Sequence, residues 1–335
     1  MEVQTALFLL EEYTASHMDI MHHESFTSDM IHDVTELLQA QLDDPCEDAL
    51  AKALFLFKGR TCYSYPPLEN VSDTLQKLRE KPQPKQKTPE WYEYRHKLIT
   101  ASSAYKAIGS NAKVRELIKS KSKPFEMYES TNTEGPMHWG VKYESVSIQY
   151  YQYEYHTKVE EFGCITHDMF TFLGASPDGI NVDETSPLYG RMLEIKNPFT
   201  REISGNPKLD YWVQCQVQME VCDLNACDFV ETKFVEYETE EAFHEDGTFL
   251  KTSDGKYKGI ILQFFTDKVV YEYAPFQCSL EEYKVWEEVC MSNGSRSWVK
   301  TIYWKLDVVS RTIIPRHPSW FNLMVPKFID VMKLI

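Results

Sequence analysis

The sequence predicts an α/β fold in which helices flank a central mixed β-sheet, with a helical extension at the N-terminal side. Short segments with period-two alternation are typical of strands, and residues 193–196 (LEIK) form the clearest one. Between these segments, apolar residues recur at helical spacing. The chain has 335 residues, of which 43% are apolar, so it can bury a sizeable core.

Residues 1–62 are interpreted as an acidic helical extension. Leu7, Leu10 and Tyr13 recur at helical spacing, and Val34 and Leu38 do the same further on. Residues 1–60 contain three basic and twelve acidic residues, a net charge of −9. We expect the extension to pack on the rest of the chain; binding a partner or shielding a basic region are the alternatives.

Residues 63–87 are interpreted as a connector, with a short helix (DTLQKLREK) and then an extended, soluble spacer (PQPKQKTP). A domain boundary is expected near Lys87. Residues 81–125 hold eleven Lys or Arg and three Glu, a net charge of +8, although the whole chain carries −16. The negative total argues against binding nucleic acid over the whole surface, whereas the basic block is where a phosphate chain is expected.

Residues 88–102 predict a helix that begins at Thr88, with Pro89 in its first turn. A second helix is expected to follow, capped by Thr100 or Ser102. A helix N-terminus with a free hydroxyl and the nearby Arg95 can bind a phosphate group. The alternative is a surface ion pair for Arg95 and a capping role for Ser102.

Residues 111–137 predict a basic helix and a polar loop (ESTNTEGP). The helix that follows places Gly140 and Glu144 on one face, so that Glu144 could face a site. The alternative is that Glu144 is an ordinary exposed residue of this helix. Four tyrosines, at positions 150, 151, 153 and 155, favour a change from helix to strand. Residues 207–221 predict a helix with Gln214 and Gln218 on one face. Residues 227–237 then predict a strand, residues 255–275 two more, and residues 279–291 and 320–335 two helices.

Residues 172–198 are the most informative stretch. On a strand, Glu194 and Lys196 share one face while Leu193 and Ile195 share the other. Asp178 lies sixteen positions before Glu194, and a loop at 181–191 would bring the two carboxylates together. With the carbonyl of Ile195 they make an all-oxygen site, which suits Mg²⁺ or Mn²⁺ rather than Zn²⁺. Lys196 would help position or deprotonate the attacking water.

This pattern resembles the PD-(D/E)xK nuclease superfamily, with Pro177 and Asp178 followed by Glu194-x-Lys196. Three further motifs are similar to the phage lambda exonuclease, or YqaJ viral recombinase, family and occur in the family's order. They are WYEYRHKLITAS at 91–102, HWGVKYE at 138–144, and NPFT with YWVQCQVQ between 197 and 218. The resemblance implies a restriction-endonuclease-like nuclease core over residues 88–236, which residues 237–335 would complete with strands and helices.

The resemblance also implies a DNA exonuclease that depends on Mg²⁺, with Mn²⁺ as a substitute. Asp178, Glu194 and the Ile195 carbonyl would hold metal, and Glu144 would help to bind a second ion. The implied catalytic residues are Asp178, Glu194, Lys196 and Gln214. The amide of Gln214 would bridge the water and the scissile phosphate.

Arg95 and Ser102 match the family's residues that hold the 5′-phosphate end of DNA. The implied function is 5′-to-3′ resection of linear duplex DNA in recombination or repair, in a viral or virus-derived setting. The implied partners are double-stranded DNA ends, a single-strand annealing protein and a homotrimeric ring of this chain. Two other functions stay open: a structure-selective endonuclease on the same fold, and a non-catalytic protein that binds DNA ends.

Other features exclude several classes. No run of 18 apolar residues exists, so no membrane span is expected, and the acidic start lacks the basic segment of a signal peptide. The eight cysteines form no C-x-x-C pair, which favours free thiols over a zinc site or disulfides. An intracellular protein, in the nucleus or cytoplasm or at a viral replication site, is therefore expected rather than a secreted one.

Overall fold

The computed structural model describes the chain except for residues 1, 18–24, 42–49, 51–52, 55–70 and 126–134. Its strands are β1 (Ile99–Thr100), β2 (Val159–Glu160), β3 (Ile165–Thr166), β4 (Leu173–Ala175), β5 (Gly179–Asn181), β6 (Met192–Lys196), β7 (Ala226–Glu236), β8 (Lys258–Phe265), β9 (Val269–Tyr273) and β10 (Ser297–Pro315). Its helices are α1 (Glu2–Ser16), α2 (Phe26–Gln41), α4 (Val71–Glu80), α5 (Pro89–His96), α6 (Ala101–Ile108), α7 (Asn111–Ser122), α8 (Pro136–Glu154), α9 (Leu209–Cys222), α10 (Glu240–Glu245), α11 (Leu280–Met291) and α12 (Pro318–Met332).

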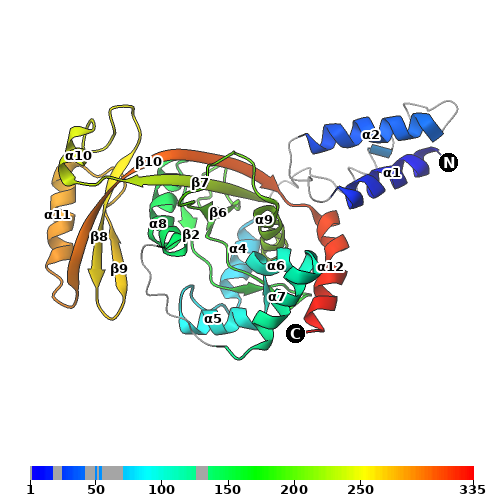
Figure 1. Cartoon of the computed structure of the whole chain (residues 1–335), viewed down its shortest axis with the longest axis horizontal. Coiled ribbons are helices and arrows are strands. Elements are labelled where there is room, and N and C mark those ends of the chain that lie inside the picture. The colour runs from blue at the N-terminus through cyan, green and yellow to red at the C-terminus, as the bar shows by residue number, and fades with distance from the viewer. Residues whose placement is uncertain (1, 18–24, 42–49, 51–52, 55–70, 126–134) are drawn as a thin grey trace.

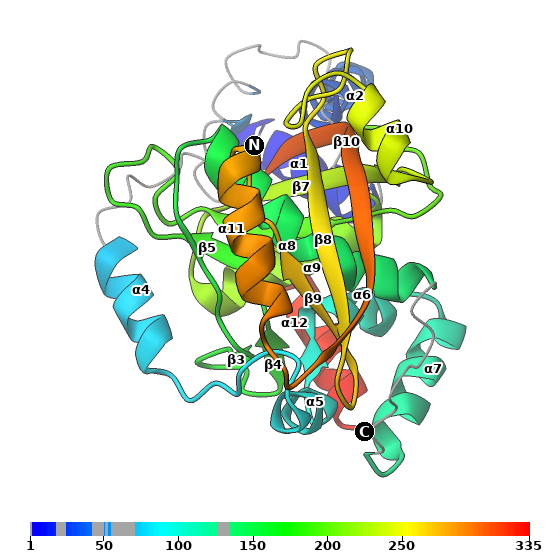
Figure 2. The ribbon, with the colours of Figure 1, turned by 90° about the vertical axis from the view of Figure 1, so that its left-hand side faces the viewer.

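The structure confirms the predicted α/β fold, with helices around a curled mixed sheet (Figures 1 and 2). Among the described residues the sheet has the strand order β2-β5-β6-β7-β10-β8-β9, in which β6 and β7 run parallel and the other neighbours antiparallel. A second sheet joins β1, β4 and β3. The long strands β7 and β10 lead from the helical side of the molecule to a lobe of β8, β9, α10 and α11 (Figure 1).

The predicted hairpin consists of β5 and β6. Gly179 lies opposite Leu193 in this antiparallel pair, so one step further along the register Asp178 faces Glu194. A side chain at position 179 is sterically excluded, because a Cβ there would lie 2.1 Å from Cγ1 of Val159 on β2. The glycine after Asp178 therefore lets β2 and β5 pair closely beside the candidate site.

Helix α8 covers one face of this hairpin. Tyr151 is fully buried in a cluster with Leu193 and Ile195, as predicted for the apolar face of β6. The predicted change to a strand near residue 150 is wrong, because α8 continues to Glu154. Tyr143, Tyr150 and Tyr151 recur at helical spacing and all point into packed clusters, so tertiary packing outweighs the strand preference of tyrosine.

A buried ionic network fastens α8 to the sheet. Asp228 on β7 is fully buried and accepts a hydrogen bond from the Tyr151 hydroxyl at 2.5 Å. Its other contacts are Arg311 at 2.9 Å and Arg191 at 3.3 Å. Removing one partner from such a buried group leaves uncompensated charge.

Asp228→Ala is therefore expected to lower the free energy of unfolding by about 3–5 kcal/mol, because both arginines lose their carboxylate. Chemical denaturation with urea measures the change. The matched control is Asp330→Ala, since Asp330 is 73% exposed and pairs with Lys333 at the surface; that change should be within about 0.5 kcal/mol of wild type. Equal effects of the two substitutions would contradict this role of Asp228.

Residues 81–88, the basic stretch before α5, do not form the soluble spacer that the sequence predicts. The stretch is extended, but Gln83 accepts from the Gly163 N–H at 2.6 Å and Gln86 donates to two backbone carbonyls. The preceding short helix, predicted correctly as α4, buries Leu75 and Leu78 in the main core. The expected boundary at 62/63 and part of the polar loop at 129–136 lie outside the described residues.

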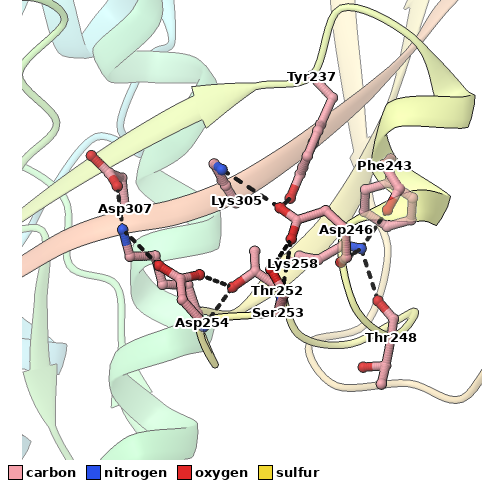
Figure 3. A network of polar contacts seen from close by, with 11 residues as sticks. Tyr237, Phe243, Asp246, Thr248, Thr252, Ser253, Asp254, Lys258, Lys305 and Asp307 are labelled. Carbon is pink, nitrogen blue, oxygen red and sulfur yellow. Dashed lines mark hydrogen bonds and ion pairs between the residues drawn. The ribbon is translucent and has the colours of Figure 1, made fainter.

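A polar network organises the far lobe (Figure 3). The Lys258 ammonium is buried and donates to the carbonyl oxygens of Phe243, Asp246 and Thr248. The carboxylate of Asp246 in turn accepts from the Tyr237 hydroxyl at 2.7 Å. This lobe lies at the end of β10 remote from α12 (Figure 1), so its network supports the fold rather than the candidate site.

The predicted free thiols are confirmed for the six described cysteines, all of which are buried and unpaired; Cys46 and Cys62 lie outside the described residues. In the part of the chain that the structure covers, no helix is both long and apolar enough to cross a membrane.

Candidate active site

One pocket brings together every residue that the sequence assigned to the site. It has a volume of about 620 Å³ and lies between the β5–β6 hairpin and helices α5, α6, α8 and α9. Its lining includes Arg95, Ser102, Glu144, Asp178, Glu194, Ile195, Lys196 and Gln214. These residues span 120 positions of sequence, from Arg95 to Gln214, so their meeting in one cavity is a property of the fold.

The two hairpin carboxylates lie side by side, as the predicted hairpin requires. Asp178 Oδ2 accepts a hydrogen bond from the backbone N–H of Ile195 at 2.7 Å, which fixes the carboxylate against β6. The pKa of Asp178 is raised well above its usual value, first by burial and then by the negative charges of Glu194 and Glu144. Such crowding of negative charge is relieved when a cation binds between the groups.

Glu194 is almost completely buried and is surrounded by donors. Its Oε1 accepts from the Lys196 ammonium and from Gln214 Nε2 at 2.7 Å, and its Oε2 accepts from Gln218 Nε2 at 2.7 Å. The sequence placed Gln214 and Gln218 on one helical face but assigned only Gln214 to the site. Gln218 is thus a site residue that the assignment missed, although the four-residue spacing pointed to it.

The charge state of Lys196 follows from the same contacts. Burial disfavours its ammonium form, but Glu194 and Asp178 outweigh this effect and raise the pKa of Lys196 above its usual value. The side chain is therefore protonated around neutral pH and acts as a hydrogen-bond donor in the pocket.

The second group of residues forms a cationic corner where α5 meets α6. The Arg95 guanidinium lies 4.0 Å from the ring centroid of Trp91, and its Nη2 donates to Ser102 Oγ at 3.0 Å. Thr100, rather than Ser102, is the N-cap of α6. The Ser102 hydroxyl therefore lies in the first turn of the helix, beside the Arg95 guanidinium and at the positive end of the helix dipole.

Trp91 completes this corner and was not singled out from the sequence. Its ring stacks on Arg95, and its Nε1 donates to Ser176 Oγ at 3.1 Å, just before the hairpin. The cationic corner and the segment just before the hairpin are therefore connected through the side chain of Trp91.

Glu144 lies in the same pocket but forms an ion pair with Lys87. Its Oε1 is 2.7 Å from the ammonium of Lys87, whose pKa is raised because Glu144 and, more weakly, Asp178 outweigh burial. Among the described residues, no group of three or more His, Cys, Asp or Glu side chains is arranged to hold a metal ion. Glu144 is therefore not gathered with Asp178 and Glu194 into a ready three-carboxylate cluster.

The donor set at the hairpin nevertheless fits a hard divalent cation. Two carboxylates, Asp178 and Glu194, and the Ile195 carbonyl supply oxygen atoms only, which is the ligand type that Mg²⁺ and Mn²⁺ prefer. Burial and the negative charges of Glu194 and Glu144 raise the pKa of Asp178, and a bound cation would favour its ionised form. One ion at the hairpin is compatible with these residues.

Comparison with known proteins finds a family similar to the middle of this chain. Residues 90–225 match the family of the YqaJ-like viral recombinase domain, which confirms the resemblance found in the motifs at 91–218. An uncharacterized protein of Acanthamoeba polyphaga mimivirus, R354, is 27% identical over 296 residues, covering 76% of this chain and 52% of that protein. The chain thus spans about half the length of the curated relative it matches.

Two solved structures resemble the chain as well. The alkaline exonuclease LHK-Exo from Laribacter hongkongensis has a TM-score of 0.43 and 19% identity, covering 74% of this chain and 92% of its own. A phage related exonuclease from Haemophilus somnus 129PT has a TM-score of 0.40 and 14% identity, covering 71% and 92% respectively.

Proposed function

Because residues 90–225 of this chain form a YqaJ-like viral recombinase domain, we propose that the chain is a DNA nuclease that depends on a divalent metal ion, and specifically an exonuclease on duplex ends. The observation that carries the proposal is the single pocket shared by the carboxylate pair and the cationic corner. A pocket with both parts can bind a terminal phosphate and hydrolyse a nearby phosphodiester.

The metal, for which we propose Mg²⁺, would be held by Asp178, Glu194 and the Ile195 carbonyl. When bound, it supplies positive charge that activates water and stabilises the charge developing on the phosphate. Glu194 is held in place by Gln214 and Gln218. We propose that protonated Lys196 donates a hydrogen bond that orients the attacking water or stabilises the phosphate oxygens. Gln214 would orient the same water.

The cationic corner gives the proposed enzyme its preference for ends. Arg95 and Ser102 can donate to a terminal phosphate, which carries more negative charge than an internal diester. With the 5′-terminal phosphate bound there, the carboxylate pair would act on the same strand, so we propose digestion from the 5′ end. The 3′ tail that remains would be the substrate of a single-strand annealing protein.

A gel assay tests the proposed function. Linear duplex DNA and a covalently closed circle of the same sequence are incubated with the protein in Mg²⁺ or in EDTA. We expect the linear duplex to be degraded only in Mg²⁺, while the circle stays intact. Cleavage of the circle would favour the endonuclease alternative, and binding of ends without cleavage in any divalent metal would favour the non-catalytic one.

We further propose that three copies assemble into a ring around DNA, as the family resemblance implies. With a net charge of −16, such a ring could hold DNA only if basic residues face the channel. Multi-angle light scattering is expected to give three times the mass of one chain, 39.2 kDa. A stable monomer that still digests long DNA processively would contradict this expectation.

Three assignments complete the proposal. The nuclease unit would comprise residues 88–236 and be completed by residues 237–335, with the acidic extension packed outside it. Residues 81–87, which the sequence predicts to be part of the connector, would belong to the unit because Gln86 binds the carbonyl of Pro177 just before the hairpin. We propose that the protein acts inside a cell, which is compatible with the buried free thiols.

A further inference from the structure

Lys87 is held in a backbone conformation that lysine rarely adopts. Its φ is +63°, in the left-handed region where glycine is the usual residue. A residue with a side chain pays a free-energy cost there, and such strain clusters at functional sites. The side chain of Lys87 lines the same pocket as Asp178 and Glu194. The strained backbone at Lys87 thus places its ammonium group in the wall of the pocket.

Contacts on both sides of Lys87 fix its position. Gln86 Nε2 donates to the carbonyl oxygen of Phe162 at 2.8 Å and to that of Pro177 at 3.0 Å. Pro177 directly precedes Asp178, so these bonds attach the segment to the hairpin. On the other side, Thr88 accepts from the Trp91 N–H and caps α5. These anchors hold the backbone at Lys87 beside the pocket.

The ammonium of Lys87 is paired with the carboxylate that a second cation would use as a ligand. It lies 2.7 Å from the Glu144 carboxylate, with both side chains at the wall of the pocket. Glu144 was the residue assigned to the second ion from the sequence. A divalent ion beside the same carboxylate would have to displace the ammonium, because two cations within a few ångströms repel each other strongly.

We infer that Lys87 replaces a second metal ion beside Glu144, so that the pocket takes up a single divalent cation at Asp178, Glu194 and the Ile195 carbonyl. This inference rests on the proposed nuclease function and departs from the two-ion expectation. The ammonium supplies a positive charge and hydrogen-bond donors on the Glu144 side of the pocket.

Isothermal titration calorimetry with Mn²⁺, on the full chain without DNA, tests the inference. Wild type is expected to bind one ion per chain. Lys87→Gly removes the ammonium and suits the positive φ, so the fold should be retained, as a thermal melt can verify, and two ions are expected. Lys87→Arg keeps the charge and should still bind one. The double variant Lys87→Gly, Glu144→Gln should return from two ions to one.

Asp178→Ala serves as the control for the first site and is expected to abolish Mn²⁺ binding in the wild-type background. If wild type binds no Mn²⁺, or if Asp178→Ala binds it normally, the proposed metal-dependent function fails. If wild type binds two ions, or if Lys87→Gly still binds one, the role of Lys87 is overturned and the proposed function stands.

Discussion

Replacement of Lys196 by alanine is expected to lower the rate of DNA hydrolysis by at least about a hundredfold, because catalytic residues that act as a unit lose most of their effect together. The substitution removes one of the two donors to Glu194 Oε1 and the positive charge beside that carboxylate. The same reasoning applies to Asp178→Ala and Glu194→Ala, which remove the proposed metal ligands. Initial rates of nucleotide release from a linear duplex measure these effects.

The matched control is Lys106→Ala, because Lys106 forms an exposed ion pair with Glu116 outside the pocket. Its rate should stay within about twofold of wild type, since exposed pairs contribute little. Lys196→Gln is the second variant, which retains a donor and keeps the test informative if the alanine variant unfolds. A folded Lys196→Ala protein with near-normal activity would contradict the proposed mechanism.

The second large effect concerns the DNA end. A 5′-phosphate should be favoured over a 5′-hydroxyl by roughly 2–4 kcal/mol, or about thirty- to thousandfold in initial rate, through charge-assisted hydrogen bonds and the helix N-terminus. Arg95 is placed for this role by its stack on Trp91 and its bond to Ser102. Arg95→Ala should slow phosphorylated ends strongly and hydroxyl ends little, so that the two rates converge.

Arg95→Lys should restore only part of the preference, because an ammonium keeps the charge but not the two parallel donors. Initial rates on both ends, for wild type and the two variants, measure this. If Arg95→Ala slows both ends by the same factor, Arg95 supports folding or catalysis and does not recognise the phosphate.

The sequence was sufficient to predict those parts of the site in which residues close in sequence also contact each other. Period-two alternation at β6 and the turn-rich loop before it predict the hairpin, and the hairpin alone brings Asp178 to Glu194. Helical spacing likewise places Gln214 and Gln218 together, although only the structure shows that both contact Glu194. The roles of these residues in catalysis stay predictions.

Contacts between residues far apart in sequence could not be predicted from local sequence patterns. The segment at Lys87 is basic and rich in proline, which is typical of a solvated spacer, and its docking depends on the carbonyl of Pro177 ninety-one positions away from Gln86. The tyrosines of α8 are strand formers that helical packing overrides. Strand β10 was not predicted, and its nineteen residues are stabilised by pairing with β7 and β8.

The central claim is that this pocket recognises the 5′ end of duplex DNA and hydrolyses the strand that begins there. The most direct test is a time course with one linear duplex that carries a label either on its 5′-terminal nucleotides or on its 3′-terminal nucleotides. We predict that the 5′ label appears as mononucleotide at the earliest times, while the 3′ label stays in long fragments. Release of the 3′ label first, or internal fragments from both substrates, would contradict the account.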